Sequence, residues 1–180
     1  MTAPDIVFTE HQIPELIADL SDDDPLKRQS ARLKLIHLTP QCVPALLDAL
    51  KSRNVNTRWE AVHALGDLRQ PEFASALVDM LTDEDDGVRW IAMDSLLYLN
   101  RGCLRPLLDK YIKDFGSVLL RQSLHHILHV LKDEHQLKAP EIELYNLLNK
   151  PTFPGFGFSW PSEAAWAAER ALVALELGKE

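Results

Sequence analysis

The chain has 180 residues and a formal net charge of −8, with 27 Asp and Glu against 19 Lys and Arg. Because an acidic surface repels phosphate backbones, this charge argues against nucleic acid as a partner. No apolar stretch is long enough to span a membrane, and the first residues lack the basic segment of a targeting signal. We therefore expect a cytoplasmic protein that does not contact a membrane.

A helical pattern recurs four times along the chain, each time starting at an arginine. The segments read RQSARLKLIHL from Arg28, RWEAVHALGDL from Arg58, RWIAMDSLLYL from Arg89 and RQSLHHILHVL from Arg121, at intervals of 30, 31 and 32 residues. Apolar residues stand three, seven and ten places after each arginine, which puts them on one stripe of a helix. The pattern predicts four amphipathic helices of one repeating unit.

A second apolar segment follows each of the first three helices, at residues 43–50, 76–81 and 106–111. A further copy at residues 14–20 precedes the first arginine, so the array is predicted to open on a lone second helix. A hairpin of this length cannot bury both of its helices, so neighbouring hairpins must stack. We predict a half repeat and four hairpins, with approximate bounds 10–21, 25–54, 55–85, 86–116 and 117–150.

Two prolines indicate where helices begin. Asp24–Pro25 and Thr39–Pro40 each place a capping side chain directly before a proline. Proline fits the first helical position, where its missing N–H costs no hydrogen bond. The sequence therefore predicts a helix start at each of these two places.

The predicted fold class is all-α, a right-handed α-solenoid of stacked antiparallel helical hairpins that covers residues 1–150. Residues 151–161 depart from the repeat and form a loop rich in aromatic side chains. Residues 162–180 are rich in alanine and predict a closing helix. Because the open end of a solenoid needs a cap, we expect this helix to cover it.

Several polar positions also recur with the repeat, since aspartates precede the first and third of the four arginine helices. Together with the alanine and leucine positions, they resemble the HEAT-like repeats of the phycobilin lyase type, best over residues 12 to 113. Around Arg121 the likeness weakens, because Phe115 and Ser117 stand where the acids should be. In that family the acids and arginines resemble a polar ladder between repeats. The resemblance implies structural roles for Arg28, Arg58, Arg89, Asp22, Asp24, Asp83 and Asp85.

Trp59 and Trp90 both follow a repeat arginine directly, about 140° around the helix from the apolar stripe. That face should meet water. Two indoles in one column could form an apolar ridge that anchors a protein partner. Alternatively, each indole packs over the loop of the adjacent repeat or is buried in a homodimer.

Three aspartates, Asp48, Asp79 and Asp109, share one register on the second helices. Stacked repeats would align them in an acidic column that could receive a basic peptide. The alternative is an ordinary solvated polar face, because Lys51 and Lys110 stand close to them in sequence.

The aromatic loop offers another candidate surface through Phe156, Phe158 and Trp160. These side chains either plug the last hairpin or form a recognition loop on a rigid scaffold. The sequence leaves both alternatives open.

His125, His129 and Asp133 are spaced four residues apart on one predicted helix, which is the only arrangement suggestive of a metal site. A metal site needs three or four convergent ligands, and one helix supplies too few. Cys42 and Cys103 match no metal spacing and are too few for a disulfide framework. We therefore predict no metal and no cofactor.

The predicted function is that of a scaffold or adaptor, which binds another protein or peptide on the solenoid surface and catalyses no reaction itself. The acidic surface favours a basic partner, and a homo-oligomer is compatible with the pattern. The alternative is a bilin lyase-like protein or another HEAT-repeat protein that handles a small ligand or chromophore. That alternative rests on the resemblance of the repeats alone.

Overall fold

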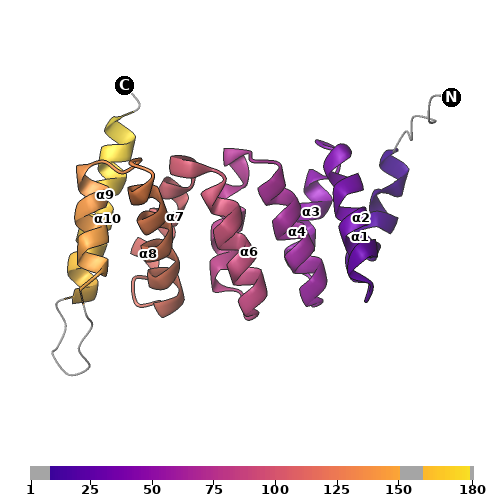
Figure 1. The fold of residues 1–180 in the computed structure, drawn as a ribbon, viewed down its shortest axis with the longest axis horizontal. Helices are drawn as coiled ribbons and strands as arrows, with labels where there is room; N and C mark the ends of the chain where they lie inside the picture. The colour runs from indigo at the N-terminus through magenta and orange to yellow at the C-terminus, as the bar shows by residue number, and fades with distance from the viewer. Residues whose placement is uncertain (1–8, 151–159, 179–180) are drawn as a thin grey trace.

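The computed structural model describes residues 9–150 and 160–178, and every regular element within them is helical. The helices follow one another along one elongated array (Figure 1). The α-helices are α1 (Ile13–Asp19), α2 (Pro25–His37), α3 (Val43–Ala49), α4 (Val55–Asp67), α5 (Ala74–Asp79), α6 (Asp86–Leu97), α7 (Leu104–Lys113), α8 (Val118–Asp133), α9 (Ala139–Leu148) and α10 (Trp160–Leu177). Short 3-10 turns are η1 (Glu10–Gln12), η2 (Pro71–Phe73), η3 (Met80–Thr82) and η4 (Asn100–Cys103). None of these helices is both long and apolar enough to cross a membrane.

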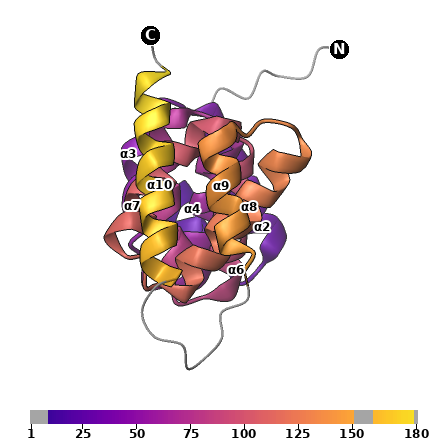
Figure 2. The ribbon, with the colours of Figure 1, turned by 90° about the vertical axis from the view of Figure 1, so that its left-hand side faces the viewer.

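The helices are arranged in two layers (Figure 2). The first-helix layer contains α2, α4, α6 and α8, and the second-helix layer contains α1, α3, α5 and α7. Each second helix packs against the first helix of the next repeat, as α3 does against α4 and α5 against α6. The predicted all-α solenoid is confirmed.

The last two helices extend both layers. α9 packs against α8, and α10 packs against both α7 and α9. α10 therefore continues the second-helix layer, although α9 precedes it in the chain. Arg101 of η4 fixes this end, because its guanidinium pairs at 2.6 Å with the buried carboxylate of Glu141 in α9 and also donates to the carbonyl O of Gln136.

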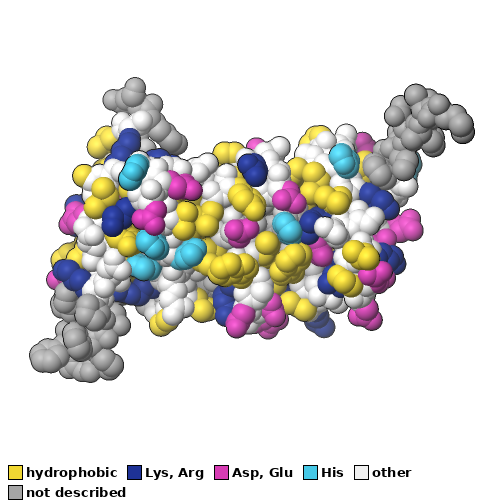
Figure 3. Space-filling view, in the orientation of Figure 1, with side chains coloured by type: hydrophobic (Ala, Val, Ile, Leu, Met, Phe, Trp, Pro, Cys, Tyr) yellow, Lys and Arg dark blue, Asp and Glu magenta, His cyan; other side chains and the backbone are white. Residues whose placement is uncertain are grey.

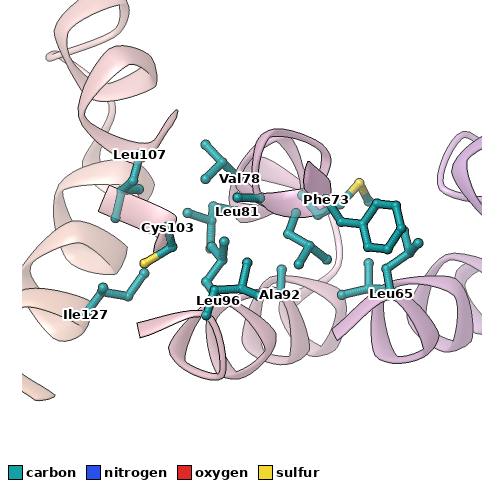
Figure 4. Close-up of a cluster of buried hydrophobic side chains, with 14 of the residues drawn as sticks. Leu65, Phe73, Val78, Leu81, Ala92, Leu96, Cys103, Leu107 and Ile127 are labelled. Atoms are coloured by element: carbon teal, nitrogen blue, oxygen red, sulfur yellow. The ribbon is translucent and has the colours of Figure 1, made fainter. Parts of the chain in front are cut away.

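A continuous apolar core lies between the two layers. Leu35, Leu65, Leu96 and Leu128, which stand seven places after the repeat arginines, are all fully buried. Side chains from both layers meet in this core (Figure 4), among them Phe73, Val78, Leu81, Leu96 and Ile127. The stripe predicted from the repeat is therefore the core face of the first helices.

The first helices begin with a shared capping device. An N-cap side chain accepts a hydrogen bond from a backbone N–H of the first turn, which would otherwise lack a partner. The four N-cap residues are Asp24, Asn54, Asp85 and Ser117. Asp24 is followed by Pro25 at the first helical position, so the predicted start of α2 is confirmed.

The helix start predicted at Thr39–Pro40 is wrong. Pro40 lies in a turn after a cis peptide bond, and α3 begins only at Val43. The Thr39 hydroxyl donates at 2.8 Å to the carbonyl O of Ile36, so it closes the preceding helix instead of capping the next one. Pro44 occupies the first turn of α3 in its place.

Candidate protein-interaction surface

The repeat arginines of the first three hairpins fold back on the loop before their own helix. Nη1 of Arg28, Arg58 and Arg89 donates to the carbonyl O six residues earlier, at 2.8, 2.9 and 2.7 Å. Arg121 differs, because it donates to the carbonyl O of Leu148 at the end of α9, at 2.9 Å. The first three arginines therefore hold each loop against its own helix.

Ion pairs between successive repeats occur at two of these arginines. Nε and Nη2 of Arg58 donate at 2.8 and 2.9 Å to Asp83, which belongs to the loop of the next repeat. Arg28 lies 3.4 Å from Glu60 of α4. Within the described residues, Arg89 forms ion pairs only inside its own repeat. Between the third and fourth repeats, the repeat arginine therefore does not form the inter-repeat ion pair that the resemblance implies.

The aspartates of the pattern shape the loops. Asp22 accepts the backbone N–H of Asp24 at 2.9 Å, and Asp83 accepts that of Asp85 at the same distance. The second aspartate of each pair is the helix N-cap. Their geometry is that of a recurring turn that leads into the first helix.

The two tryptophans lie in different environments. Trp90 is 62% exposed, whereas Trp59 is half-buried and packs against the core. The Trp59 indole lies over Gly87 of α6, where a Cβ would be 3.8 Å from its Cδ1, and it meets the ring of His63 at 5.0 Å between centroids. The Trp90 ring is tilted against His126 of α8 at 6.4 Å. Of the two indoles, that of Trp90 is therefore the more exposed.

A groove of about 310 Å³ opens beside Trp90, between α6 and α8, and we call it the α6–α8 groove. Two turns of each helix line it: Asp86, Arg89, Trp90 and Met93 of α6, and Leu119, Gln122, Ser123 and His126 of α8. Apolar side chains and histidines gather along the middle of this face of the molecule (Figure 3). The groove combines an exposed aromatic ring with a concave surface of mixed apolar and polar side chains, so it is the candidate interaction site.

The spacing of the helices explains why the groove opens here. α4 and α6 approach closely because Gly66 faces Ser95, and a Cβ on Gly66 would lie only 2.5 Å from the Cβ of Ser95. At the next boundary the equivalent repeat positions hold Leu97 and Ile127. Larger side chains at these positions keep helix axes further apart. Accordingly, α6 contacts α8 over less of its length than it contacts α4.

The loop residues before the first helix also differ between the third and fourth repeats, in size and in charge. In the fourth repeat, Leu119 stands where Gly87 stands in the third, and Phe115 stands where Asp83 does. The Trp90 indole therefore has no glycine of the next repeat to pack over. The next loop also has no acidic side chain at the position that would pair with Arg89. A comparison of Gly87 with Leu119 along the aligned repeats is the signal that could have separated the two tryptophans in advance.

A polar cluster that the sequence patterns missed joins α2 to α4. Nη1 of Arg32 donates at 2.9 Å to the buried Glu60 and also contacts Nδ1 of His63. Burial lowers the pKa of His63, the Arg32 charge lowers it further, and Asp67 and Asp94 act in the opposite direction. The contact with a guanidinium requires a neutral imidazole that accepts at Nδ1.

The histidines of α8 pack against α9. The rings of His125 and His129 stack on Tyr145 at 5.4 and 6.0 Å between centroids. His125 Nε2 lies 2.8 Å from Oδ1 of Asn149, and His129 Nδ1 lies 3.7 Å from the carboxylate of Asp133. Within the described residues, no group of three or more His, Cys, Asp and Glu side chains is placed to hold a metal ion.

The aspartates of the second helices have basic neighbours. Lys51 pairs with Asp48 at 3.3 Å, and Lys110 pairs with Asp79 at 2.7 Å. A groove of about 280 Å³ between α5 and α7 is lined by Asp79 and Asp109, but also by three basic side chains. These cations offset much of the negative charge that the column would otherwise present.

The remaining candidates offer no surface that can be described. Phe156, Phe158 and the side chain of Trp160 lie outside the described residues. Cys42 and Cys103 are fully buried, and burial raises the pKa of Cys103 to about 12. Both thiols are therefore shielded from solvent in the folded chain.

Two layers of stacked helical hairpins define an α-solenoid, and in the first three hairpins an arginine holds the loop against its own helix. Residues 13–96 match the family model of HEAT repeats, which supports the interpretation of the array as HEAT-like repeats. HEAT repeats commonly mediate protein–protein interactions and are generally non-catalytic scaffolds. The match does not separate the phycobilin lyase type from other HEAT repeats, so that assignment stays a prediction. No curated protein matches the chain.

Proposed function

We propose that the chain is a scaffold or adaptor that binds another protein, or a peptide segment of it, at the α6–α8 groove, without catalysis of its own. The observation that carries this proposal is the 62% exposure of Trp90 at the edge of a concave surface. A rigid indole buries a large apolar area on binding and loses little conformational entropy. Such residues commonly dominate the binding energy of protein interfaces.

The groove has the composition of a small interface. Trp90, Met93 and Leu119 contribute apolar surface, and Gln122 and Ser123 contribute polar groups. Protein interfaces usually combine a dry apolar centre with a hydrated polar rim. The flexible thioether of Met93 can also adjust to the shape of a bound side chain.

Affinity capture from the source cell, followed by mass spectrometry, tests the proposal. We expect Trp90→Ala to reduce the yield of specific partners by about tenfold, as truncation of an interface anchor does. The matched control is Trp166→Ala, because Trp166 of α10 is 60% exposed and lies at the end of the array. Equal partner yields from wild type and Trp90→Ala would refute the proposal.

A further inference from the structure

Negative charge flanks the exposed indole of the α6–α8 groove. Asp86 and Asp94 stand four residues before and four residues after Trp90, so the three side chains lie along one face of α6. The carboxylate of Asp86 is 92% exposed, and that of Asp94 is partly exposed. Within the described residues, Asp86 Oδ1 pairs with Nη2 of Arg89, and Asp94 Oδ2 accepts from the hydroxyl of Tyr98. A ligand that covers Trp90 would therefore meet the second oxygen of each carboxylate.

The nearby cations leave this charge incompletely neutralised. Four successive acids at residues 83–86 face two arginines, Arg58 and Arg89. Nη1 of Arg89 is held by carbonyl oxygens of the loop, at 2.7 Å from that of Asp83. Negative charge thus remains in excess beside the groove, and it adds to the net charge of −8 of the whole chain.

We propose that this surface recognises an arginine of a basic partner segment, which stacks on Trp90 between Asp86 and Asp94. A guanidinium is planar, it stacks on aromatic faces, and its N–H groups donate to carboxylates in a fixed geometry. An apolar residue next to that arginine enters the groove against Met93 and Leu119. This inference rests on the proposed function and specifies the chemistry of the partner.

Two synthetic peptides test the proposal with the full chain. One is a short fluorescein-labelled peptide that alternates arginine with leucine, and the other replaces each arginine by citrulline, which keeps the shape without the charge. Titration followed by fluorescence anisotropy should show that the arginine peptide binds about tenfold more tightly. Trp90→Ala should remove most of this difference, because it removes the face on which the guanidinium stacks.

Two double variants separate the local charges from the overall charge. Asp86→Asn with Asp94→Asn should weaken binding of the arginine peptide by about fivefold. Asp48→Asn with Asp79→Asn changes the net charge equally on the other layer, and it should change binding by less than about twofold. Equal binding of the citrulline peptide, or equal losses in the two double variants, would overturn the inference. If either occurs while Trp90→Ala still reduces partner capture, the proposed function stands and the arginine assignment falls.

Discussion

At two neighbouring boundaries of the array, α4–α6 and α6–α8, a tryptophan stands at the same repeat position, but its side chain is exposed to different extents. At the α4–α6 boundary, Trp59 lies over Gly87 and is half-buried. At the α6–α8 boundary, Leu119 takes the place of the glycine, and Trp90 remains 62% exposed. The indole therefore packs on the next repeat at α4–α6, the closed boundary, and remains exposed at α6–α8, the open boundary.

The difference shows how a repeat array can acquire a binding site. Stability in a solenoid is approximately a sum over repeats and the interfaces between neighbours, so one interface can be loosened without unfolding the rest. The α4–α6 boundary keeps its close glycine contact and the pair between Arg58 and Asp83. The α6–α8 boundary has neither feature, and the groove lies there.

The largest expected effect comes from breaking the ion pair at the closed boundary. The side chains of Arg58 and Asp83 are only 8% and 7% exposed, and loss of Asp83 leaves the buried guanidinium with the exposed Glu84 as its remaining carboxylate. We expect Asp83→Ala to lower the free energy of unfolding by about 3 kcal/mol. Asp86→Ala, at an exposed pair with Arg89, should lower it by less than about 0.5 kcal/mol. Urea unfolding measures both, and equal losses would contradict this account of the boundary.

Truncation of each tryptophan compares the two boundaries directly. Trp59→Ala should lower the free energy of unfolding by about 2 kcal/mol, roughly half the cost of removing a fully buried aromatic side chain. Trp90→Ala should cost less than about 0.5 kcal/mol, because its indole is mostly in water. Chemical unfolding of the two variants under identical conditions provides the comparison. Should Trp90→Ala prove the more destabilising variant, the assignment of open and closed boundaries would be reversed.

The repeat pattern was sufficient to predict the two layers and the core stripe, because both follow from positions that recur in every copy. Leu35, Leu65 and Leu96 recur at one register, and each is buried by its own neighbours. The different exposure of Trp59 and Trp90 depends instead on residues of the following repeat. The repeat pattern describes what all copies share, so it does not reveal a contact that depends on one particular pair of residues.

Two other features of the structure could not be predicted from the repeat pattern, for related reasons. The contact between Arg32 and His63 joins two helices at positions that do not recur, so no pattern marks it. The placement of α10 beside α7 also breaks the order of the repeats. It follows from packing of the alanine-rich face of the helix, where Ala167, Ala168 and Ala171 are fully buried.

A smaller effect is expected from filling the close contact between α4 and α6. A methyl group on Gly66 would overlap Ser95, whose Cβ would be 2.5 Å away. Overpacking should outweigh the better helix propensity of alanine, so Gly66→Ala should lower the free energy of unfolding by about 1.5 kcal/mol. Gly116→Ala is the matched control, because nothing lies within 4 Å of its added methyl group. A stabilised Gly66→Ala variant would show that the boundary is looser than the structure indicates.

The stability of the chain should also depend on pH, through His63 at the contact between α2 and α4. His63 lies beside Trp59 and His126 beside Trp90, but only His63 is in contact with a guanidinium, that of Arg32. Burial, reinforced by this charge, lowers the pKa of His63 below its ordinary value of 6.5. The unfolded chain therefore binds a proton more readily than the folded chain. The stability contributed by neutral His63 is complete above pH 6.5 and declines as the pH falls from there toward the folded pKa.

Urea unfolding at about pH 7.5 and about pH 5.5 measures this dependence. His63→Gln removes the titrating group but keeps a polar side chain, so its stability should fall less between the two pH values than that of the wild type. His126→Gln is the matched control, because it makes the same replacement at the ring that lies beside Trp90. All three proteins share the same carboxylates, so the difference between them isolates the imidazole. An equal loss of stability in wild type and His63→Gln would mean that protonation of His63 is accommodated without cost.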